Sequence, residues 1–116
     1  MEIKEIPFNQ PMLKKAAGED EIDYYNINQR DENGGRTLEL KITDSEGRRK
    51  VVVLVDRGFC IEPREVKLKP FCGREERNRE IWRLYNEEHL TQVFLANLFS
   101  ITQPSVSLIV KQMKEK

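Results

Sequence analysis

The residues best suited to bind another molecule lie between positions 91 and 111, in the stretch TQVFLANLFSITQPSVSLIVK. Amide and hydroxyl side chains recur there and are followed by a lysine. Together they offer the hydrogen-bond donors, acceptors and positive charge that suit the base edges and phosphates of double-stranded DNA. The side chains that we predict to contact DNA are Gln92, Thr102, Gln103, Ser105, Ser107 and Lys111.

Other kinds of chemistry find little support in the chain. The single histidine, His89, follows two glutamates in a connection between predicted helices, and Cys60 and Cys72 lack both a CxxC spacing and a fourth metal ligand. No nucleophile–base arrangement and no phosphate-binding glycine loop is visible. We therefore expect no catalytic residue, no metal site and no cofactor, and we do not expect an enzyme.

The polar residues are positioned by two short predicted helices. Thr91 is placed to cap the first, which spans residues 92–99, and Thr102 is placed to cap the second. Pro104 falls in the first turn of the second helix, where its missing N–H breaks no internal hydrogen bond. Only Ser100 and Ile101 separate the two helices. So short a connection makes them cross steeply, which is the helix-turn-helix geometry.

The apolar spacing supports this interpretation, because Leu95, Ala96 and Phe99 share one helical face and Val106 and Ile109 share another. Ile101 is placed to fill the angle between them. The stretch resembles the DNA-binding helix-turn-helix of phage and bacterial transcription regulators, in which an alanine like Ala96 lies early in the first helix. The resemblance implies that these six apolar residues are buried.

One position departs from that family, which usually has glycine where this chain has Ser100. A serine with positive φ at this turn is expected to cost about 1 kcal/mol. The resemblance implies a sequence-specific DNA-binding transcriptional regulator of phage, mobile-element or bacterial origin. The alternative is a protein-interaction or assembly module in which the helix pair is a scaffold, since a fold does not determine a function.

A supporting helix is predicted before the pair, over residues 74–86, with Ile81, Leu84 and Tyr85 on one face. The run RNREIWRLYN within it is distantly similar to the C-terminal part of Mor-type phage transcription activators. Those proteins are dimers whose N-terminal region makes the subunit contact. The resemblance thus implies a homodimer here.

The N-terminal half has a different periodicity. Residues 37–43 alternate between apolar and polar, residues 44–47 resemble a hairpin turn, and residues 51–55 form an unbroken apolar run. Such a run predicts a strand covered on both faces, in part by a second subunit. A helical turn or two closed by a glycine is expected at residues 11–17, and a turn at residues 31–35.

After the apolar run, residues 59–61 predict a short extended piece that Pro63 ends, and residues 66–69 an edge strand or linker. The chain is therefore expected to be α+β: a small antiparallel sheet of hairpin or meander type within residues 1–70, followed by a helix-turn-helix region in residues 71–116.

The charge of the whole chain is balanced, with 20 basic and 20 acidic residues. Many monomeric DNA-binding proteins carry a basic excess, so binding would have to come from a local arrangement or from two subunits side by side. No transmembrane run and no signal peptide is apparent, so we expect a cytoplasmic protein without a membrane partner.

Overall fold

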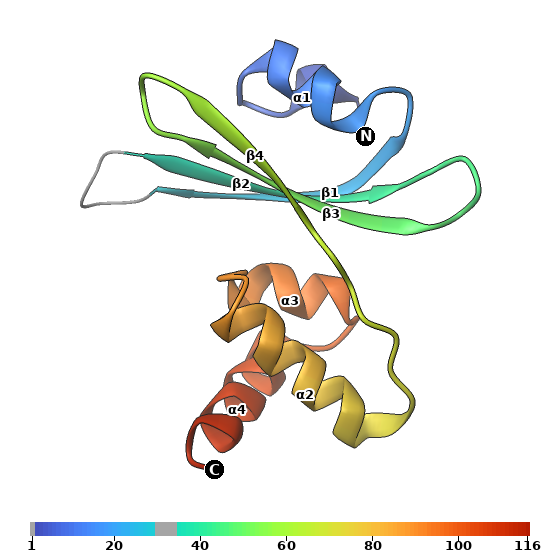
Figure 1. The fold of residues 1–116 in the computed structure, drawn as a ribbon, viewed down its shortest axis with the longest axis vertical. Helices are drawn as coiled ribbons and strands as arrows, with labels where there is room; N and C mark the ends of the chain where they lie inside the picture. The colour runs from blue at the N-terminus through green and yellow to red at the C-terminus, as the bar shows by residue number, and fades with distance from the viewer. Residues whose placement is uncertain (1, 30–34) are drawn as a thin grey trace. The chain divides into compact units, whose positions relative to one another are not determined.

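The computed structural model describes residues 2–29 and 35–116. Within it the chain forms two compact units, residues 1–68 and residues 69–116. The first contains a four-stranded antiparallel sheet and the second contains three α-helices (Figure 1). The predicted α+β class, a small sheet followed by a helical region, is confirmed.

The sheet is a meander in which each strand pairs with the next one along the chain. Each connection between described strands is short, which suits antiparallel neighbours. The strands are β1 (Glu21–Gln29), β2 (Arg36–Thr43), β3 (Arg49–Asp56) and β4 (Ile61–Val66). The predicted turn at residues 31–35 lies, except for Gly35, outside the described residues.

The last strand corrects one expectation. We predicted that Pro63 would end a short extended piece, but it lies inside β4, opposite Leu54 of β3. β4 is at the edge of the sheet, and a proline is tolerated in an edge strand because its nitrogen faces away from the neighbouring strand. For residues 66–69 we predicted an edge strand or a linker, and the structure agrees with the linker, since β4 ends at Val66 and residues 67–69 are in neither a helix nor a strand.

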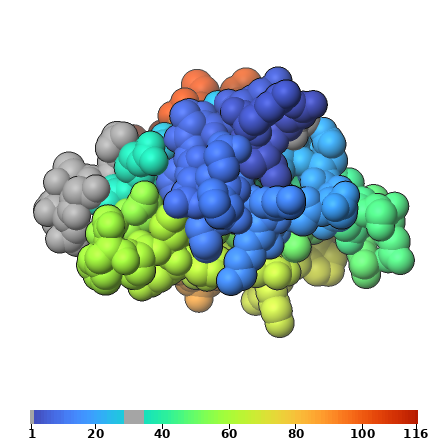
Figure 2. Space-filling model, turned by 90° about the horizontal axis from the view of Figure 1, so that it is seen from above, coloured from blue at the N-terminus to red at the C-terminus, as the bar shows by residue number. Residues whose placement is uncertain are grey.

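A short N-terminal segment covers one face of the sheet (Figures 1 and 2). It consists of a 3-10 turn (Ile3–Glu5) and α1 (Gln10–Ala17), which is capped by the Asn9 side chain and closed by Gly18 at φ +59°. The core beneath it combines both elements and is formed by Ile6, Phe8, Leu13, Ala17, Ile22, Leu38, Leu40, Ile42, Val52 and Leu54. Leu38, Leu40 and Ile42 are the apolar half of the alternation predicted for β2.

The continuous apolar run of β3 is buried from Val51 to Leu54. Val52 and Leu54 belong to the core under α1, and Val51 and Val53 lie on the opposite face of the strand. The predicted strand with two buried faces therefore forms.

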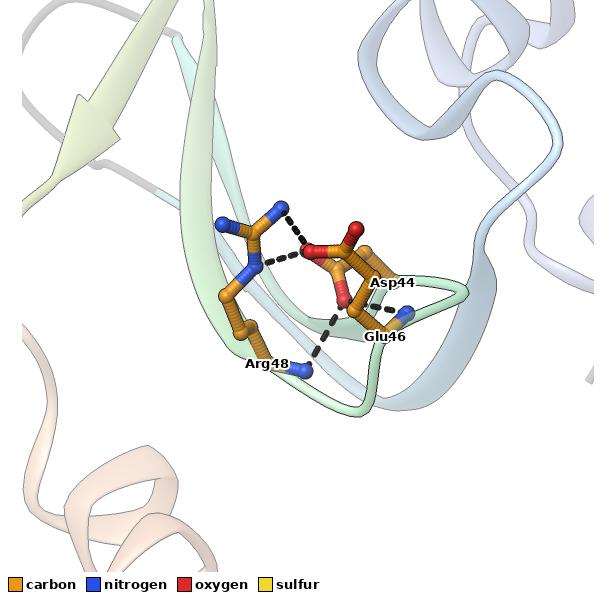
Figure 3. Close-up of polar contacts among 3 residues, drawn as sticks. All are labelled: Asp44, Glu46 and Arg48. Atoms are coloured by element: carbon orange, nitrogen blue, oxygen red, sulfur yellow. Dashed lines mark hydrogen bonds and ion pairs between the residues drawn. The ribbon is translucent and has the colours of Figure 1, made fainter.

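The turn between β2 and β3 is held by the carboxylate of Asp44 (Figure 3). It accepts backbone N–H bonds from Glu46 and Arg48 at 2.9 Å each, and the Arg48 guanidinium donates to it at 2.9 Å. These bonds, led by the backbone N–H of Arg48, favour the ionised form and lower the pKa of Asp44. The hairpin predicted at residues 44–47 is thus fixed by local hydrogen bonds.

Candidate nucleic-acid interface

The second unit contains the predicted helix pair and its support. α2 spans Gly73–Asn86, α3 spans Gln92–Leu98 and α4 spans Gln103–Lys114. α3 and α4 are bent by 111° relative to each other, which falls within the range of about 90–120° that helix-turn-helix units adopt. Among the described residues, no single helix is long and apolar enough to cross a membrane.

Both predicted caps are formed. The hydroxyl oxygen of Thr91 accepts the backbone N–H of Phe94 at 3.2 Å, and that of Thr102 accepts the N–H of Ser105 at 3.2 Å. Pro104 lies in the first turn of α4, as expected. Each cap satisfies an N–H that has no partner within its own helix, so the start of both helices is set by local sequence.

The turn between the helices is a Schellman motif. The N–H of Ile101 bonds the carbonyl of Ala96 at 3.0 Å, and the N–H of Ser100 bonds that of Asn97 at 3.2 Å. A Schellman motif requires a residue in the left-handed conformation just after the helix, and Ser100 occupies that position with φ +55°. The positive φ expected from the comparison with glycine-containing turns is therefore present on a serine, which carries the strain of its Cβ.

Replacing Ser100 by glycine is expected to raise the free energy of unfolding. Relief of left-handed strain is worth about 1–2 kcal/mol. This relief exceeds the cost of the extra conformational entropy that glycine gives the unfolded chain, about 0.4–1 kcal/mol. The free energy of unfolding should therefore rise by about 0.5–1 kcal/mol. Urea denaturation followed by circular dichroism measures the change.

The matched control is Ser107→Gly, which makes the same substitution at an exposed position inside α4. There glycine weakens the helix, and we expect a loss of about 0.5 kcal/mol. Equal effects of the two substitutions would contradict the assignment of strain to Ser100.

The predicted apolar set is buried only in part. Leu95, Ala96, Val106 and Ile109 are buried, whereas Phe99 and Ile101 are half-buried. Both residues belong to the turn between α3 and α4, where one side of each side chain remains accessible to solvent. Phe99 lies beside the Phe71 ring, with the centroids 5.7 Å apart. Further buried residues of this unit, absent from the predicted set, are Leu90, Phe94, Leu98 and Val110.

The polar side chains predicted to contact DNA lie at the surface. Thr102, Gln103, Ser105, Ser107 and Lys111 are exposed, and Gln92 is half-buried at the start of α3. The hydroxyls of Thr102 and Ser105 lie 2.8 Å apart and bond each other. The hydroxyl groups of Thr102 and Ser105 therefore already take part in hydrogen bonds at the N-terminal cap of α4. Gln103, Ser107 and Lys111 are exposed polar residues at the beginning, middle and end of this helix.

An exposed apolar residue, Leu108, was missing from the predicted set. It is 55% exposed on α4. Together with Pro104, Ser107 and Lys111 it follows the spacing of 3, 4 and 7 residues that places side chains on one helical face. The buried Val106, Ile109 and Val110 occupy the opposite side. This spacing was available in the sequence, but leucine is so common in cores that its exposure was not expected.

The surface of the helix pair is free of carboxylates. Residues 90–110 contain no charged side chain, and α4 carries only the positive charges of Lys111 and Lys114. A phosphate backbone would repel carboxylates at such a surface. The attraction that two lysines supply is nevertheless small.

The supporting helix α2 is tied to the beginning of this unit through Glu80, which is 6% exposed. Its carboxylate binds the Arg83 guanidinium at 2.7 and 2.8 Å and accepts the backbone N–H of Lys69 at 2.8 Å. The hydrogen bonding that the Arg83 guanidinium donates to Glu80 is the main cause that raises the pKa of Arg83. The burial of Glu80 was not predicted from the sequence.

The residues considered for other chemistry are separated or exposed. Cys60 and Cys72 are free and exposed, and they belong to different units. His89 has φ +59° in the connection that follows α2. Within the described ranges, no group of three or more histidine, cysteine, aspartate or glutamate side chains is arranged to hold a metal ion.

Comparisons with known proteins add no relative: no family model, no curated protein and no solved structure matches this chain.

Proposed function

We propose that the protein is a sequence-specific DNA-binding regulator of transcription that uses α4 as its recognition helix. The observation that carries the proposal is the geometry of the pair: two capped helices bent by 111°, with one side of α4 buried and the other exposing polar groups without any carboxylate. A helix presented in this way fits the major groove, which admits a single α-helix. Such a regulator would act in the cytoplasm.

Two residues have the most distinct roles in this proposal. Gln103 is the first residue of α4 and follows the capping Thr102, and recognition helices contact base edges with their N-terminal residues. Its amide carries a donor and an acceptor that match N6 and N7 of adenine. Lys111 lies eight residues on, about 12 Å along the axis, where the helix would pass the phosphate backbone.

Selection from a pool of random duplexes tests the proposal directly. Full-length protein is used to retain duplexes in a mobility-shift assay at low and at high salt, and the retained pool is sequenced. Enrichment of one motif would support sequence-specific binding. Failure to retain DNA even at low salt would contradict it and would favour the alternative of a protein-interaction module, since non-specific binding by basic residues is strongest there.

Replacing Gln103 by alanine is expected to weaken binding to the selected site by about 1–3 kcal/mol and to relax the preference at one base pair. Replacing Lys111 by alanine should instead weaken binding to all duplexes alike and lower the slope of log affinity against log salt by about one. Fluorescence anisotropy over a salt series, with the selected site and its single-base variants, separates the two effects.

Matched controls come from the same chain. Gln112→Ala removes an exposed amide near the end of α4, and Lys14→Ala removes an exposed lysine from α1. Neither should change base preference. If Gln103→Ala leaves affinity and base preference as in the wild type, then α4 is not the recognition helix.

We further propose that the protein binds DNA as a homodimer. Neutral overall charge gives one recognition helix little electrostatic affinity, and two helices that reach successive major grooves gain affinity through their linkage. Sedimentation equilibrium with and without a selected duplex is expected to show two chains per duplex. One chain per duplex at every protein concentration would refute the dimer.

A further inference from the structure

We infer that the N-terminal unit binds a small organic carboxylate in a cavity between α1 and the β3–β4 edge of the sheet. The cavity has a volume of about 300 Å³, at the lower end of the range of small-molecule sites. All the residues that line it belong to residues 1–68. The inference therefore holds whether or not the C-terminal unit binds DNA.

The floor of the cavity follows from strand register. Val52 of β3 pairs with Glu65 of β4, and Leu54 pairs with Pro63, so Val52, Pro63 and Glu65 are on the face that α1 covers. α1 is only eight residues long and buries Leu13 and Ala17 in the core. A helix about 12 Å long cannot cover a four-stranded sheet completely.

The wall is the side of α1 that faces β4. Met12 and Ala16 line the cavity from this helix and are half-buried, and with Val52 and Pro63 they provide an apolar surface. Figure 2 shows the blue N-terminal segment lying over part of the sheet, with the yellow-green chain around β4 beside it. A flat or short hydrocarbon body would bury its surface in this gap.

The charge at the rim determines the class of ligand. Three basic residues line the cavity, Lys15 of α1, Lys50 of β3 and Arg64 of β4, together with one carboxylate, Glu65. Among the described residues, neither lysine ammonium has an ion-pair or hydrogen-bond partner. Lys50 is also half-buried. Two unpaired cations next to an apolar floor favour a ligand with one anionic end and one apolar end.

A peptide strand added to the edge of β4 is a less suitable occupant. Pro63 has no N–H to donate to an added strand, and β4 carries charged side chains at Glu62, Arg64 and Glu65. Proline and charge on an edge strand oppose such pairing. The cavity between helix and sheet, rather than the strand edge, is therefore the site that we infer.

The experiment compares 2-naphthoate with 2-naphthamide, which has the same ring and no charge, by ¹H–¹⁵N correlation spectra of the full-length protein. We expect naphthoate to shift the amide signals of α1, β3 and β4 selectively and in a saturable manner. Naphthamide should bind about tenfold more weakly, and added salt should reduce the difference. Equal affinity of the two compounds, or no saturable shift, would overturn the proposal.

Substitutions localise the site. Lys50→Gln should weaken naphthoate binding about three- to tenfold and leave naphthamide binding unchanged. Lys14→Gln removes a neighbouring lysine of α1 that does not line this cavity, and it should change the affinity less than twofold. An equal loss with both variants would indicate non-specific attraction to a basic surface and would overturn the proposal.

A third variant, Ala16→Phe, fills the cavity from its half-buried wall and should abolish binding of both compounds while the remaining spectrum is retained. Undiminished naphthoate binding in a folded Ala16→Phe protein would place the ligand elsewhere. If this variant does not fold, the comparison of Lys50→Gln with Lys14→Gln decides.

Discussion

Replacing Phe94 by alanine is expected to lower the free energy of unfolding of the C-terminal unit by about 3–5 kcal/mol. Phe94 belongs to α3 and is completely buried, and it is the largest of the fully buried side chains. Removing its ring deletes apolar surface and leaves a cavity that surrounding residues fill only partly. A loss of this size is a large part of the stability of a small domain.

Trp82 provides the signal for this measurement. It is the only tryptophan in the chain and lies in α2 beside Tyr85, with the ring centroids 6.2 Å apart. Its fluorescence during urea denaturation therefore reports on the C-terminal unit. The control is Val93→Ala, at a neighbouring position that is 39% exposed; its effect should stay below about 1 kcal/mol. Similar losses in the two variants would contradict the packing described here.

Replacing Glu80 by alanine is expected to cost about 3 kcal/mol, because it removes one partner of a buried ion pair. The Arg83 guanidinium would keep its charge in a partly buried position, and the N–H of Lys69 would lose its acceptor. A guanidinium stays protonated at every pH at which folding is usually measured, so the variant retains this positive charge without its partner. Denaturation followed by Trp82 fluorescence again measures the loss.

Two further variants distinguish the ion pair from surface charge. Glu75→Ala breaks an exposed pair with Arg79, 4.0 Å long, and should cost at most about 0.5 kcal/mol. The double variant Glu80→Leu with Arg83→Met replaces the charges by apolar groups of similar size, and should recover much of the loss of Glu80→Ala. A double variant as unstable as Glu80→Ala would show that the position of Glu80, and not the unpaired charge, determines stability.

The sequence by itself determined features that depend on a few neighbouring residues. The caps at Thr91 and Thr102, the turn at Ser100 and the hairpin at residues 44–47 are closed by hydrogen bonds between residues at most five positions apart. Because these bonds are local, residue type and spacing were sufficient to predict them. The alternation of Leu38, Leu40 and Ile42 likewise predicted the buried face of β2, since side chains of a strand alternate between its two faces.

Only the tertiary structure decided the features that join distant parts of the chain. Pro63 lies within a strand because β4 is an edge, Glu80 is buried because its partners include Lys69 eleven positions away, and Leu108 is exposed because other residues of α4 face the core. The cavity between α1 and β4 depends on strand register and on how far a short helix reaches across a sheet. Burial and register are set by packing over long separations, which the types and spacing of neighbouring residues do not specify.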